Sequence, residues 1–146
     1  MSLVSLSVCK RRLALLWFAG FTPAFVLFFI QWLNVPEYRD NSKEAWGWFL
    51  ASIVPTFSLV TASYLQDAFR PPSAHQVEGA AIHMTLGISS LYIVVLLSLI
   101  AIAPYYSRAE PLEWLRTSSI VLALLQGVVS AFLGAFLGSQ QEKAPA

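Results

Sequence analysis

Few side chains in this sequence could do chemistry, and the only group with metal-ligand character lies around residue 80. His75 and Glu78 are three residues apart and would share one face of a helix. His83 follows His75 by eight residues, more than two helical turns, so one straight helix could not bring all three to one ion. Asp67 is the nearest further ligand. We therefore expect no metal and no cofactor, and keep a membrane enzyme built on these three residues as the third alternative.

Motifs of catalysis and of ion transport are missing from the sequence. It has no glycine-rich phosphate loop, no His-Glu-x-x-His zinc motif and no nucleophile elbow. Its apolar stretches contain no Asp, Glu, Lys or Arg, which proton relays and ion-coupled transporters normally place within the membrane. The net charge of +1 offers no field for nucleic acid. We therefore expect a protein that is not an enzyme.

Hydroxyl side chains mark the apolar stretch 45–66, which also contains Pro55. Proline has no backbone N–H, so the carbonyl of Ala51, four residues earlier, loses its helical partner, and a nearby hydroxyl could satisfy it. Ser52, Thr56 and Ser63 fall on one helical face. Such a face either bonds to its own helix and packs closely, or lines a pore.

Gln126 is the most deeply placed amide, and an unpaired buried amide would cost about 1–3 kcal/mol. We expect it to find a partner on the helix 45–66 or on another subunit. Gln31 lies near a membrane interface, where water can hydrate it. His83 should hydrogen-bond to a neighbouring helix. The residues that could line a pore are Ser52, Thr56, Ser63, His83, Gln126 and Ser130.

Small residues recur at helical spacing in the last apolar stretch. The helix-packing residues predicted there are Gly127, Ala131, Gly134, Ala135 and Gly138. Glycines at this density would break a helix in water, but in a membrane they let a second helix approach closely. The pattern predicts a contact surface, either within one bundle or between subunits.

Composition decides the fold class. Of the 146 residues, 57% are hydrophobic and only 12% are charged, against about 25% in ordinary soluble domains. Four stretches are long enough for membrane helices, which need roughly 20 apolar residues. We predict an all-α integral membrane protein, with residues 1–146 as one transmembrane domain of two helical hairpins and no soluble domain. The four helices are expected at about 12–33, 45–66, 76–103 and 113–138.

Basic residues suggest an orientation in the plasma (inner) membrane. Lys10, Arg11 and Arg12 precede the first helix, which places the N-terminus and, after four crossings, the C-terminus in the cytoplasm. Cys9, the single cysteine, is either a free thiol at the membrane edge or a site of lipidation. The sequence Pro104-Tyr105-Tyr106 is expected to close the third helix at the outer interface.

The two predicted outer loops resemble each other. Their prolines, tyrosines and tryptophans recur at a displacement of 68 residues, as Pro36/Pro104, Tyr38/Tyr106 and Trp46/Trp114. A duplicated hairpin and the common composition of interfacial loops both explain this similarity.

Taken together, these features favour a non-enzymatic structural or accessory subunit that works through helix–helix contacts in the lipid bilayer, by self-association or beside a larger membrane protein. The alternative is a small oligomeric pore or channel lined by the hydroxyl-rich face of the second helix with Gln126 and Ser130.

Overall fold

The computed structural model describes residues 3–68, 76–106 and 111–138, which are almost entirely helical. In chain order the elements are β1 (Leu3–Ser5), α1 (Leu6–Asn34), α2 (Pro36–Asp40), α3 (Ser42–Ala68), β2 (Gln76–Glu78), α4 (Gly79–Tyr106) and α5 (Pro111–Gly138).

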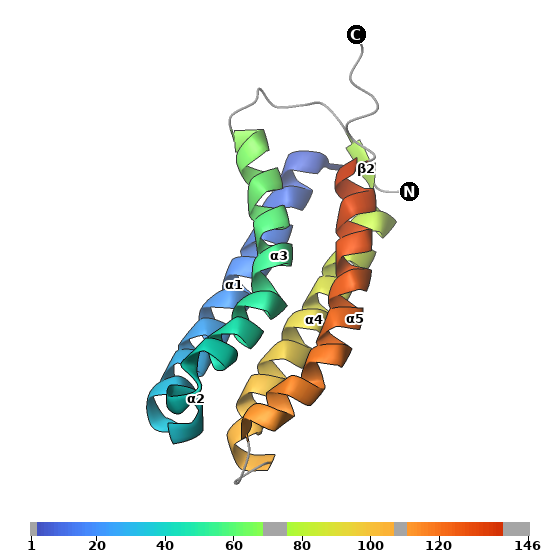
Figure 1. Ribbon diagram of the computed structural model, residues 1–146. Coiled ribbons are helices and arrows are strands. Elements are labelled where there is room, and N and C mark those ends of the chain that lie inside the picture. Colours follow the sequence, from blue (N-terminus) through green and yellow to red (C-terminus); the bar gives the residue numbers. More distant parts are fainter. Residues whose placement is uncertain (1–2, 69–75, 107–110, 139–146) are drawn as a thin grey trace.

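Four long helices form an elongated bundle (Figure 1). Helix α1 packs against α3 and α4, and α5 packs against the same two helices, so α1 and α5 occupy opposite corners. Each long helix has the length and hydropathy of a membrane span, over Ser7–Asn34, Ser42–Gln66, Gly79–Tyr105 and Pro111–Ala135. The predicted all-α membrane bundle of two hairpins, α1/α3 and α4/α5, is confirmed.

The boundaries of the first and third long helices differ from the expected ones. The first helix begins at Leu6 rather than near residue 12, so the basic triplet lies within α1. The third was expected over 76–103 but begins at Gly79 and continues to Tyr106. Pro104 therefore lies inside α4 and does not close it, whereas Pro36 is the first residue of α2. The two prolines of the suggested repeat thus have different structural roles, and the duplication stays a prediction.

Three short elements were not expected from the sequence, the strands β1 and β2 and the helix α2. Strands β1 and β2 form a short antiparallel ribbon in which Val4 lies opposite Val77, joining the start of the chain to the start of α4. Helix α2 is a single short turn at the opposite end of the bundle, where it forms the connection between α1 and α3 (Figure 1). It contacts α1, α3 and α5, and its Tyr38 is fully buried.

Aromatic side chains fill the seam between α1 and α3. Phe28 stacks on Phe49 with ring centroids 4.6 Å apart, and Phe21 stacks on Phe57 at 4.8 Å. Offset and edge-to-face ring pairs of this kind add about 0.5–1.5 kcal/mol beyond their area. These contacts fix α3 against α1.

A glycine sets the approach of α1 to α4. A Cβ atom at Gly20 would stand 2.6 Å from Cγ2 of Ile93, closer than any real Cβ contact. Only the missing side chain lets Ile93 lie against the α1 backbone. Gly20 thus makes a close helix contact that the sequence did not predict, whereas the contact surface predicted in the last apolar stretch stays a prediction.

Candidate functional site

Gln126 lies where the backbone of α3 is interrupted. Pro55 cannot donate to the carbonyl of Ala51, and the side chain of Gln126 reaches across from α5 to that carbonyl. Its Nε2 lies 3.4 Å from the Ala51 oxygen and 3.3 Å from Oγ1 of Thr56. The expected partner of Gln126 on the second long helix is thus present, and both contacts are long enough to be weak.

A second side chain meets α3 at the same level. The buried Tyr92 of α4 donates its hydroxyl to the carbonyl of Ser52. The hydroxyl of Ser52 bonds back to the Trp48 carbonyl at 2.8 Å. Two neighbouring helices therefore contact α3 next to its proline interruption, α4 through Tyr92 and α5 through Gln126.

Gln31 has the same relation to a second proline. Pro104 of α4 leaves the carbonyl of Ile100 without its helical donor, and Nε2 of Gln31 on α1 lies 2.7 Å from that oxygen. From the sequence alone, Gln31 near a membrane interface was expected to be open to hydration by water. Pro104 in the sequence indicates that the Ile100 carbonyl lacks its helical donor. The sequence does not show that Gln31, on another helix, supplies the replacement.

The other polar residues considered for a pore do not join this group. Ser63 donates to the Val60 carbonyl of its own helix at 2.9 Å. Nδ1 of His83 lies 2.5 Å from the Gly79 carbonyl in the same helix, and the residue is exposed, so the expected bond to a neighbouring helix was wrong. Ser130 is half-buried in α5. Only Ser52, Thr56 and Gln126 come together.

The small residues of α5 lie on the outer surface of the bundle and face away from its core. Val129 and Leu133 face the core and are buried. A Cβ atom at Gly127 or Gly134 would meet nothing within 4 Å, so no described part of the chain packs closely against these two glycines. Gly138 is the last residue of α5, and its burial lies outside what the structure describes. Gly127, Ala131, Gly134 and Ala135 are exposed on α5, beside larger exposed side chains such as Leu124.

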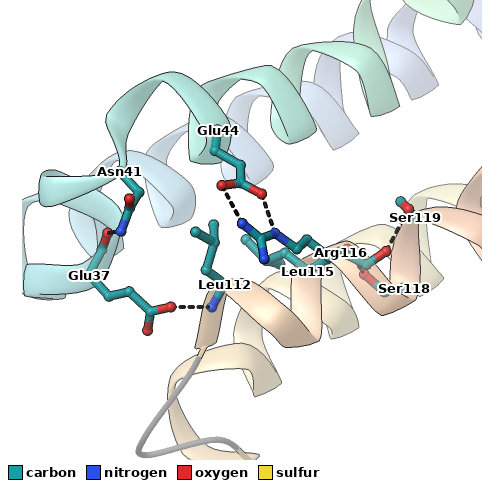
Figure 2. Close-up of polar contacts among 8 residues, drawn as sticks. All are labelled: Glu37, Asn41, Glu44, Leu112, Leu115, Arg116, Ser118 and Ser119. Atoms are coloured by element: carbon teal, nitrogen blue, oxygen red, sulfur yellow. Dashed lines mark hydrogen bonds and ion pairs between the residues drawn. The ribbon is translucent and has the colours of Figure 1, made fainter.

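Charged residues tie the helices together at the end where α2 lies (Figure 2). Oε1 of Glu37 accepts a hydrogen bond from the backbone N–H of Leu112 at 3.2 Å, which satisfies a free donor in the first turn of α5. Arg116 makes two bonds to the carboxylate of Glu44, one of them 2.7 Å long. Both partners are exposed to solvent, so this ion pair contributes little to stability.

The remaining residues with reactive side chains form no site within the described chain. No group of three His, Cys, Asp or Glu residues in the described ranges lies close enough to hold a metal. Glu78 belongs to strand β2 rather than to the helix that carries His83, and His75 lies outside the described residues. Cys9 is completely buried, so its thiol is not accessible for the lipidation considered above.

Comparison with protein-family models, with curated proteins and with solved structures found no match to this chain. The fold and these contacts define its class, a small four-helix membrane protein whose described polar residues mostly bond to its own backbone.

Proposed function

We propose that this chain is a non-enzymatic structural or accessory membrane subunit that assembles with other helices through the exposed face of α5. The observation that carries the proposal is the position of Gly127 and Gly134, which are exposed and have open space around them. Their row of small residues lies on the opposite side from the core residues Val129 and Leu133. The face is thus free for a neighbour.

Small residues favour such a contact because they let two helix backbones approach closely, where van der Waals packing is strong. The partner is a second copy of the chain or a larger membrane protein. The proposed setting is the plasma (inner) membrane with both termini in the cytoplasm, which the basic residues at the start of α1 support.

The test compares two glycines in matched surroundings. Gly87 of α4 and Gly134 of α5 are both exposed, and a Cβ atom at either would meet nothing within 4 Å. We expect the native mass of the complex in mild detergent to exceed that of one chain, to fall with Gly134→Leu and to stay unchanged with Gly87→Leu. Equal masses for the wild type and both variants would contradict the proposal.

The pore alternative gains no comparable support from the packing. Thr56 and the Ser52 carbonyl are engaged by Gln126 and Tyr92 inside the bundle. Large side chains such as Trp17 and Tyr92, whose rings lie 5.8 Å apart, fill the interior between α1 and α4.

A further inference from the structure

Four buried side-chain atoms near the α2 end of the bundle have no hydrogen-bond partner among the described residues. They belong to α1, α2 and α3, and they are Oε1 of Gln31, Oε2 of Glu37, the hydroxyl of Tyr38 and Nε1 of Trp48. Tyr38 is 0% exposed and Trp48 is 9% exposed, so bulk water does not reach either side chain freely.

Two of these side chains, Tyr38 and Trp48, lie beside Phe28 of α1. The ring of Tyr38 lies 6.0 Å from the Phe28 ring, and the ring of Trp48 lies 6.4 Å from it. Gln31 follows Phe28 by three residues on the same helix and so shares its side. Glu37 precedes Tyr38 in α2, and its other oxygen is held by α5. Three helices thus each contribute buried polar atoms at this end of the bundle.

Leaving these atoms unpaired would be costly. Each buried polar group without a partner costs about 1–3 kcal/mol, and such groups are normally satisfied by protein atoms or by ordered water. Four unpaired atoms would therefore cancel a large part of the stability of a small protein, which is about 5–15 kcal/mol.

The chemistry of the four atoms is balanced between donors and acceptors. Trp48 can only donate, and the free oxygen of Gln31 can only accept. Burial, and the nearby Glu37, raise the pKa of Tyr38 above its ordinary value, so its O–H stays protonated and can donate. A bare cation would meet the N–H of Trp48, and an anion would meet the Glu37 carboxyl. A neutral molecule with two donors and two acceptors fits this set.

We propose that the α2 end of the bundle binds ordered water molecules, which hydrogen-bond to the unpaired atoms of Gln31, Glu37, Tyr38 and Trp48. Buried waters in proteins make about three hydrogen bonds each, to groups that otherwise have no partner. This site connects α2 to α1 and α3 and does not depend on the assembly proposed for α5.

The direct test uses the indole N–H of Trp48 as the probe. In protein labelled with ¹⁵N-tryptophan, the Trp48 signal is identified by elimination, with single Trp→Phe substitutions at the other four tryptophans. We expect a dipolar cross-peak between this N–H and water, with opposite signs in NOESY and ROESY spectra, as bound water gives. Absence of that cross-peak in the folded wild type would overturn the proposal.

A substitution gives an independent measure. Tyr38→Phe removes one partner of the water and should raise the unfolding equilibrium constant roughly fivefold or more. Tyr105→Phe is the matched control, because Tyr105 is 83% exposed, and it should leave the constant unchanged. If the Tyr38 hydroxyl is an unpaired group, its removal stabilises the protein or has no effect, and either result contradicts the proposal.

Discussion

At the scale of single residues, the structure uses two glutamines in the same way. Gln126 donates to the carbonyl freed by Pro55, and Gln31 donates to the carbonyl freed by Pro104. In a membrane an unsatisfied carbonyl is expensive, because no water is available to replace the lost donor. Each glutamine therefore satisfies a backbone group and joins two helices with the same side chain.

The first prediction tests this pairing by a double-mutant cycle. Gln126→Leu should cost about 0.5–1 kcal/mol of unfolding free energy, because the Ala51 carbonyl loses a donor that is present but weakly bonded. In a Pro55→Ala background the backbone N–H of residue 55 can serve that carbonyl, so Gln126→Leu should cost less. Unfolding in mixed detergent micelles measures both values.

The two proline sites serve as controls for each other. Gln31→Leu should couple to Pro104→Ala, since Gln31 serves Ile100, and should be additive with Pro55→Ala. Equal costs of Gln126→Leu with and without Pro55 would show that the Ala51 bond contributes nothing.

The second prediction concerns Cys9, whose side chain is 0% exposed. A water-soluble maleimide should label the folded protein very slowly and the SDS-denatured protein completely, because only an accessible thiolate reacts. A cysteine introduced at the exposed position Ser7 of a Cys9→Ala protein supplies the fast reference. Equally fast labelling at both positions would show that the start of α1 is open.

At the scale of elements, the α1–α4 contact depends on a missing side chain. Gly20 lets Ile93 lie against the backbone of α1, whereas the glycines of α5 have open space around them. The value of a glycine for packing thus depends on which way it faces. The sequence shows that small residues share a face of a helix but not whether that face points into the bundle.

The third prediction compares two Gly→Ala substitutions. Gly20→Ala should destabilise the bundle by about 1–3 kcal/mol, because the new methyl group would overlap Ile93. Gly87→Ala meets no atom within 4 Å and should be neutral or stabilising by up to about 1 kcal/mol. Thermal or detergent unfolding of the purified variants gives both values.

Shortening the facing side chain checks the cause. Adding Ile93→Ala to Gly20→Ala should cost less than the sum of the two single substitutions, because the overlap disappears. Strict additivity would place the effect of Gly20→Ala somewhere other than the α1–α4 contact.

At the scale of the whole molecule, the sequence predicts the membrane helices, which depend on hydropathy. It does not predict most contacts between elements, which depend on how the helices are oriented. Charge-free apolar stretches are long and continuous, so the four helices follow directly from them. The ribbon does not, because its strands are three residues each and pair across most of the first hairpin. The Gln126 partner could be predicted, since Pro55 marks the break. Gln31 could not, because its partner lies on a helix whose orientation only the fold sets.

The fourth prediction concerns the orientation of the whole chain. On the proposed cytoplasmic side, neutralising Lys10, Arg11 and Arg12 leaves only Arg70 and Lys143. The opposite side keeps four basic residues, namely Arg39, Lys43, Arg108 and Arg116. A C-terminal reporter should be cytoplasmic in the wild type and partly or wholly inverted in the triple Gln variant. Reporter activity on each side of the membrane measures this, and an external C-terminus in the wild type would refute the proposed orientation.

The ribbon between β1 and β2 has a consequence for the order of events during synthesis. Residues 3–5 leave the ribosome about 70 residues before their partners, residues 76–78, which at 5–20 residues per second is roughly 4–15 s. The N-terminal strand must therefore wait without its pair until the first hairpin is complete and α4 begins. Pairing then closes a ring around the whole first hairpin, so a chain that stops after α3 can never acquire it.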